Sequence, residues 1–190
     1  MGKMDMLKSG DLLFVSRKDI LLPGAIAEST GMGQARLNYS HVGIVELGRD
    51  GRLWVLHADS GKGCWRDRLS HFLRHQVGRI DLYRPKNPVD MEDVLRRARS
   101  MLGQPYNVTF DPSEQGWYCS NYVWYAFKKT GLFHPIPMQF GPGGKKVLPF
   151  WRAYFRKLGR EIPVGKPGIA PNTLILQGGL KFLGTLSFGK

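Results

Sequence analysis

The chain has 190 residues, of which 42% are hydrophobic and 12% aromatic, which fits one globular domain with its own core and excludes wholesale disorder. Its mean hydropathy is negative and no apolar run approaches the ~18 residues of a membrane span, which argues against a spanning helix. Lysine and arginine outnumber aspartate and glutamate by 28 to 15, a formal net charge of +13. Such a charge attracts polyanions: nucleic acid, anionic lipid or the bacterial cell wall.

The basic residues are spread along the chain without a zinc-finger spacing or an RNA-recognition motif, so nucleic acid is not the expected partner. The segment Met1–Lys8 carries charges and lacks the apolar core of a signal peptide. We therefore expect no Sec signal, and a protein that is cytoplasmic or is exported by a non-Sec route to act in a periplasm. In such a chain Cys64 and Cys119 are expected to be free thiols.

The first half of the chain predicts mainly strands. Residues 11–15 are apolar enough for a buried strand, and the glycines and proline in 23–38 predict a loop that includes a short helix. Residues 42–47 and 53–58 form a predicted hairpin, because Asp50-Gly51 between them is typical of a two-residue turn.

Further along, helices alternate with the last predicted strand. We expect a helix over 66–77, a strand over 79–83, a helix that begins at Asn87-Pro88 and ends before Gly103, and a helix over 119–130. A basic aromatic stretch at 150–157 predicts one more short helix. The predicted organisation is a catalytic domain at 1–135 and a Pro/Gly-rich extension at 136–190 that packs on the same domain.

Cys119 stands at the start of a predicted helix, where unpaired backbone N–H groups and the helix dipole favour a thiolate. His41 stands on a predicted strand, and an imidazole within reach would complete the activation of a thiol nucleophile. Strand alternation places His57 and Asp59 on one face of the partner strand, so either side chain could orient His41. Together these residues indicate a cysteine hydrolase or acyltransferase.

Other interpretations of the same residues stay open at this stage. A buried cysteine is often only a small apolar side chain, and a strand histidine is often only a hydrogen-bonded core residue. Cys64, His71 and His75 lack the spacing of a closed zinc site, so no metal or other cofactor is expected. The stretch from Trp151 to Lys157 either faces an anionic membrane or wall, or packs its aromatic rings on the core.

Five motifs together resemble the permuted branch of the NlpC-type papain-like hydrolases, the YaeF/YiiX-like group. They are Gly10-Asp11-Leu12-Leu13-Phe14, Ser40-His41-Val42-Gly43-Ile44, Val55-Leu56-His57-Ala58, Gly103-Gln104-Pro105-Tyr106 and Tyr118-Cys119-Ser120-Asn121-Tyr122-Val123. As in the permuted group, the histidine comes first and the cysteine follows 78 positions later (119 minus 41).

The resemblance implies an α+β, circularly permuted papain-like (NlpC-like) fold in which an antiparallel sheet is followed by the nucleophile helix. It makes Cys119 the nucleophile, with its backbone N–H as oxyanion donor, and His41 the general base. His57 takes the place of the third, usually acidic, residue, with Asp59 as the alternative. Tyr106, Tyr118 and Ser120, which lie in the matching motifs, are the expected substrate-binding residues.

The expected function is a cysteine peptidase or amidase that cleaves an amide bond, first of all in the stem peptides of peptidoglycan, as an exported antibacterial effector. A secretion-system carrier or an immunity protein would then be a partner. The first alternative is a lipid-directed thiol acyl hydrolase or acyltransferase, because the similar lecithin:retinol acyltransferase has the same histidine-first order. The second alternative is a catalytically inactive basic module that binds a wall, a membrane or nucleic acid.

Overall fold

A computed structural model describes residues 6–16, 22–30, 38–76, 78–144 and 146–186 of the chain. Within these residues, none of the helices has the length and apolar character that a membrane crossing requires. The centre of the fold is one six-stranded sheet in which every pair of neighbours is antiparallel. In spatial order its strands are β4 (Gly63–Arg68), β3 (Leu53–Asp59), β2 (Tyr39–Leu47), β1 (Leu12–Ser16), β5 (Arg79–Pro85) and β8 (Leu180–Leu186).

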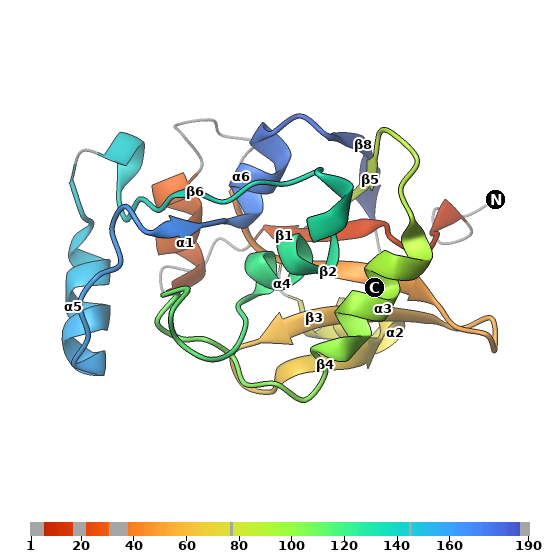
Figure 1. Cartoon of the computed structure of the whole chain (residues 1–190), viewed down its shortest axis with the longest axis horizontal. Helices are drawn as coiled ribbons and strands as arrows, with labels where there is room; N and C mark the ends of the chain where they lie inside the picture. The colour runs from red at the N-terminus through yellow and green to blue at the C-terminus, as the bar shows by residue number, and fades with distance from the viewer. Residues whose placement is uncertain (1–5, 17–21, 31–37, 77, 145, 187–190) are drawn as a thin grey trace.

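In the described residues, six α-helices and a small second sheet surround this centre (Figure 1). The helices are α1 (Leu22–Thr30), α2 (Leu69–His75), α3 (Met91–Ser100), α4 (Cys119–Ala126), α5 (Pro149–Leu158) and α6 (Pro171–Leu176). The second sheet pairs β6 (Ile136–Pro137) with β7 (Pro167–Gly168). Helix α5 forms one end of the molecule, at the left of Figure 1.

Alternating side chains of the central sheet build two separate cores. Leu12 and Phe14 of β1 pack in the core that includes α3, α4 and α6, whereas Leu13 and Val15 pack in the core that includes α2. The sheet is therefore covered on both faces, and α4 lies on the face opposite α2.

The loop that leads into α4 is held to the edge of the sheet. Its residue Gln104 accepts a hydrogen bond from the backbone N–H of Cys64 on β4 at 2.8 Å, and Gly103 donates one to the Cys64 carbonyl at 2.8 Å. Further on, Trp117 donates to the carbonyl of Pro105 at 3.0 Å. Gly116 has a φ of +100°, and a Cβ there would lie 2.5 Å from that carbonyl oxygen, so the loop needs glycine at this position. The start of α4 is fixed in this way.

The sequence-based prediction of an α+β fold with an antiparallel sheet followed by the cysteine helix is confirmed. Several boundaries were wrong. The helix expected to begin at Asn87-Pro88 begins only at Met91. The helix expected over 66–77 begins only at Leu69, because residues up to Arg68 pair with β3 in a strand that the prediction missed. The helix expected over 119–130 stops at Ala126 and is followed by a 3₁₀ turn at Lys128–Thr130.

The part of the chain after residue 136 contributes to both sheets. β8 pairs with β5 and completes one edge of the central sheet, while α6 packs in the same core as α4. Neither β8 nor α6 was expected from the sequence. The predicted loop over 23–38 contains α1, and its residues 31–37 lie outside the described residues.

Candidate active site

Cys119 is the first residue of α4 and is 3% exposed. Asn121 accepts a hydrogen bond from the backbone N–H of Tyr118 at 2.7 Å, which fixes the entry into the helix. The thiol of Cys119 points to the carbonyl oxygen of Ser40 on β2, with an S–O distance of 3.9 Å. The cysteine thus lies against the strand segment that carries His41.

Burial raises the pKa of the Cys119 thiol to about 11. Hydrogen bonds from the backbone of Val42 and from Ser120 pull this pKa downward, as expected near a helix N-terminus, but they are outweighed. The sequence favoured a thiolate, whereas the structure shows a site that keeps the thiol protonated. Attack on a substrate therefore needs a base that removes the proton.

His41 and His57 form a direct pair, with 2.9 Å between Nε2 of His41 and Nδ1 of His57. Both rings pack on Phe72 of α2, at centroid distances of 6.0 Å for His41 and 5.0 Å for His57. His57 is 1% exposed, and its burial, with a smaller effect of the charge at His41, holds its pKa well below the ordinary value. His57 is therefore a neutral imidazole at physiological pH.

The hydrogen bond between the two rings is compatible with either histidine as the donor, and therefore with two tautomers of His41. One proton lies between the two rings, and Nε2 of His57 is buried without a hydrogen-bond partner in the described part of the chain. If His41 donates from Nε2, its Nδ1 carries a lone pair and can accept the thiol proton. The tautomer in which His57 donates would leave a proton on Nδ1 of His41 and would not act as a base.

The sulfur of Cys119 lies beside the backbone of β2 on both sides of His41, at the carbonyl of Ser40 and the backbone of Val42. The His41 ring stacks on Phe72 of α2, whereas the next residue, Val42, packs in the same core as Cys119. The structure thus brings His41 and His57 together and places Cys119 against the backbone next to His41. The proton transfer between Cys119 and His41 belongs to the proposal below.

Of the other predicted site residues, Asp59 lies at the turn after β3, and the three predicted substrate-binding residues lie near Cys119. Asp59 accepts a hydrogen bond from the backbone N–H of Gly61 at 2.8 Å in the turn after β3. Tyr106, Tyr118 and Ser120 all line a cavity that Cys119 also lines. Burial, together with the neighbouring Cys119, raises the pKa of Tyr106, so its hydroxyl keeps its proton.

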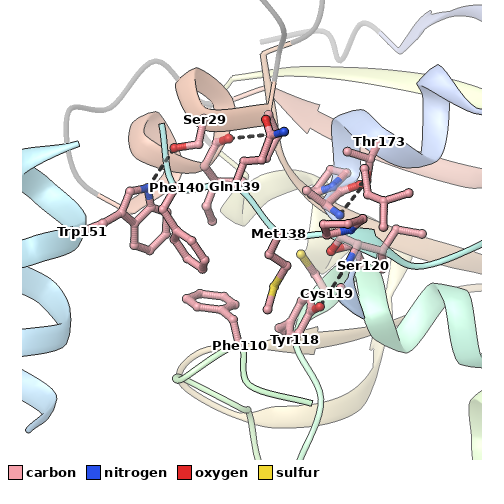
Figure 2. A pocket seen from close by; sticks show the side chains of 18 of the residues that line it. Ser29, Phe110, Tyr118, Cys119, Ser120, Met138, Gln139, Phe140, Trp151 and Thr173 are labelled. Carbon is pink, nitrogen blue, oxygen red and sulfur yellow. Dashed lines mark hydrogen bonds between the residues drawn. The ribbon is translucent and has the colours of Figure 1, made fainter. Parts of the chain in front are cut away.

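The cavity has a volume of about 220 Å³ and is walled almost entirely by apolar groups. In Figure 2, Cys119 and Tyr118 lie on one side of it, Phe140 and Trp151 lie on the other, and the side chain of Met138 lies beside the sulfur. None of the residues that the structure assigns to its lining is charged or a histidine.

Most of the hydroxyl groups at its wall are engaged within the protein. Ser120 donates to the carbonyl of Ile169 at 2.8 Å, the backbone N–H of Ile169 donates to the hydroxyl of Tyr118 at 3.3 Å, and the indole N–H of Trp151 donates to Ser29 at 2.9 Å. The cavity therefore offers a substrate mainly apolar contact.

Several cavity residues were not predicted from the sequence. They come from the loop before α4, from the segment around β6 and from β7 and its C-terminal continuation: Phe110, Met138, Phe140 and Ile169. Trp151 was noted only as a residue of a basic aromatic stretch. Since these segments are far apart in the sequence, no local pattern indicates that they meet at Cys119.

Within the described residues, no three His, Cys, Asp or Glu side chains are grouped so that they could hold a metal ion. His71, one of the residues considered for a metal set, instead bonds Asp67 at 2.8 Å, and its ring lies on that of His75. Cys64 is buried in the α4 core.

Residues 6–158 match the model of a family described as permuted papain-like amidase enzymes, YaeF/YiiX, of the C92 family. Among solved structures, the chain is similar to YiiX from Escherichia coli O157:H7, described as a metalloprotein, with a TM-score of 0.76 and 19% sequence identity. The match covers 94% of this chain and 97% of that one. No curated protein sequence matches the chain.

Proposed function

The chain belongs to the permuted papain-like amidase family of YaeF and YiiX, and from this premise we propose that it hydrolyses an amide whose acyl part is an apolar chain. Cys119 is the nucleophile, His41 is the general base, and His57 is the positioning residue that selects the tautomer of His41. The observation that carries the choice of substrate is the apolar cavity beside the Cys119 sulfur.

In the first half of the reaction, Nδ1 of His41 accepts the thiol proton while the sulfur attacks the carbonyl carbon of the amide. The carbonyl oxygen gains the negative charge, and the backbone N–H of Cys119 at the start of α4 is the donor placed to stabilise it. When the C–N bond breaks, His41 returns the proton to the leaving amine.

In the second half, His41 takes a proton from water, and the hydroxide attacks the thioester carbonyl. The C–S bond breaks, the carboxylic acid leaves, and the thiol regains its proton. The raised pKa of Cys119 supports this order, because a thiol that is neutral at rest requires the base at the moment of attack. Catalytic contacts of this kind commonly tighten only when a substrate is bound.

The cavity supports an apolar acyl chain better than a peptidoglycan stem peptide. A stem peptide carries carboxylates and an amine, and these groups lose free energy when they leave water without a charged or hydrogen-bonding partner. The described lining provides no charge and most of its hydroxyl groups are engaged within the protein, whereas each buried methylene gains about 0.8 kcal/mol. We therefore favour the lipid-directed interpretation and keep cleavage of stem peptides, with the effector role it implied, as its competitor.

The experiment measures kcat/KM for p-nitroanilides of straight-chain acids from two to twelve carbons, with the p-nitrophenyl esters as a second series. We expect kcat/KM to rise about fourfold per methylene until the cavity is filled. Intact-protein mass spectrometry after a rapid quench should show one acyl group, which peptide mapping assigns to Cys119.

Purified muropeptides and phospholipid vesicles are incubated in parallel, and their products are identified by mass spectrometry. Cleavage of muropeptides without any dependence on acyl-chain length would favour the stem-peptide interpretation. No turnover of any substrate, together with no covalent adduct at Cys119, would leave the inactive binding module.

A further inference from the structure

Helix α5 carries three basic side chains on its exposed side. Arg152, Arg156 and Lys157 are all exposed, whereas Trp151 and Phe155 are 3% and 1% exposed on the inner side. Arg152 and Arg156 are four residues apart and therefore lie on one face of the helix. The helix is amphipathic, and its inner face reaches the cavity beside Cys119 through Trp151.

The cations of α5 differ from those of α3. On α3, Arg97 bonds Asp93 at 2.8 Å, Arg96 also pairs with Asp93, and Arg99 pairs with the buried Glu46. No Asp or Glu of the described residues lies within 4.0 Å of the charged groups of Arg152, Arg156 or Lys157. The positive charge of α5 is therefore available to an anionic partner outside the described chain.

Apolar side chains are exposed at the same end of the molecule. Val108, Ile136 and Val164 are 40%, 41% and 54% exposed. Val108 adjoins α5, since its carbonyl accepts a hydrogen bond from the hydroxyl of Tyr154 at 2.8 Å. Ile136 lines the cavity, and the residue after Val164, Gly165, donates to the carbonyl of Met138 at 3.0 Å.

We call these residues the α5 end: the three α5 cations together with Val108, Ile136 and Val164, which belong to segments that contact α5 or the cavity. We infer that the α5 end docks on an anionic lipid bilayer. Cations that pair with lipid phosphates, beside apolar side chains that enter the interface, are the composition of a membrane-binding surface. A polysaccharide or a nucleic acid would use the charge but would leave the apolar side chains in water.

Binding needs no catalysis, so the test does not depend on the proposed activity and uses the full chain with Cys119→Ser. The protein is sedimented with vesicles of phosphatidylcholine and phosphatidylglycerol in equal parts, and with vesicles of phosphatidylcholine alone. We expect binding only to the anionic vesicles. Binding should be weaker at 0.5 M salt than at 0.1 M salt, because the screening length falls from about 10 Å at 0.1 M to about 3 Å at 1 M.

Two matched triple variants separate the α5 end from net charge. Arg152→Gln, Arg156→Gln and Lys157→Gln combined should weaken vesicle binding about a hundredfold, at about fivefold per cation. Arg49→Gln, Arg74→Gln and Lys181→Gln combined remove the same charge from exposed positions outside α5, and binding should fall much less. Val164→Glu tests the apolar part alone and should also weaken binding. Thermal unfolding confirms that every variant is folded.

Equal losses in the two triple variants would show that only net charge matters and would overturn the inference. It would also be overturned if the protein sedimented with purified cell-wall sacculi or bound nucleic acid but ignored anionic vesicles. Vesicle binding without any acyl hydrolysis would uphold the docking surface and reject the proposed activity, so the two failures can be told apart.

Discussion

Cys64 and Cys119 are both buried in the same core, yet they differ in what surrounds the sulfur. They are 1% and 3% exposed, and burial raises the pKa of the two thiols to about 12 and about 11. Only Cys119 begins a helix, accepts hydrogen bonds from neighbouring backbone and borders the cavity. Burial alone therefore does not single out Cys119 as the proposed nucleophile; the helix end and the cavity set it apart from Cys64.

The largest expected difference between the two cysteines is in catalysis. Cys119→Ala should lower kcat/KM on the best acyl p-nitroanilide to the uncatalysed level, because no other group forms the acyl-enzyme. Cys64→Ala should change kcat/KM less than threefold and act mainly on stability, since it removes a buried side chain from the core. Hydrolysis that survives in the purified Cys119→Ala protein would contradict the assignment of the nucleophile.

The next largest effect concerns the histidine pair. His41→Gln should lower kcat/KM about 10²- to 10⁴-fold, the range for loss of a general base. His57→Gln should cost less and should move the acidic limb of the pH–rate profile, because it acts through His41.

Asp59→Asn is the matched control for the third residue. The Asp59 carboxylate accepts from Gly61 in a turn, so this variant should leave the pH–rate profile unchanged. A shift of the profile in Asp59→Asn and none in His57→Gln would make Asp59 the positioning residue.

Filling the cavity at Met138 should change the choice of substrate. A Cβ at the neighbouring Gly168 would lie 2.4 Å from the Met138 side chain, so this part of the wall is tightly packed and has little room to yield. Met138→Trp should shorten the preferred acyl chain by about two methylenes, which lowers kcat/KM about 16-fold on the longest good substrate. Activity on the two-carbon substrate should stay within about twofold.

Leu176→Trp makes a comparable change at an exposed residue that is not part of the cavity lining, and it should leave the chain-length profile as it is. Parallel profiles for wild type and Met138→Trp would mean that the acyl chain binds elsewhere.

The local parts of this site could be predicted from the sequence, and the cavity could not. The hairpin that carries His41 and His57 and the helix that begins at Cys119 follow from turn residues, alternation and helix signals within a few positions. The cavity forms where Phe110, Met138 and Ile169 meet from separate segments, and only tertiary packing brings them together. The same limit explains the missed β8, whose Gly184 and Lys181 weaken the local strand pattern, so that only the pairing with β5 reveals the strand.

Alkylation compares the two thiols directly. A pKa of about 11 leaves roughly one Cys119 in 10⁴ as thiolate at pH 7, so iodoacetamide should react slowly and about tenfold faster per pH unit up to pH 10. Cys64 should react about tenfold more slowly than Cys119 at each pH, since it is buried away from the cavity. Peptide mapping after timed alkylation gives both rates, and equal rates would remove the distinction between the two cysteines.

The smallest expected effect tests the consequence of burial at His57. Burial raises the pKa of both thiols, whereas it lowers the pKa of this imidazole. Burial lowers the pKa of His57 well below 6.5, so the folded state keeps it neutral at a pH where the unfolded chain protonates it. Its contribution to stability is therefore present above pH 6.5 and is lost progressively as the pH falls below it, by about 1 kcal/mol per pH unit at most, or about 2 to 4 °C in Tm. In His57→Gln the fall in Tm between pH 7 and 5.5 should be smaller by that amount, as measured by thermal unfolding monitored by circular dichroism. An identical fall in both proteins would mean that His57 is protonated in the folded state, and a charged His57 beside His41 would oppose the imidazolium that the proposed mechanism requires.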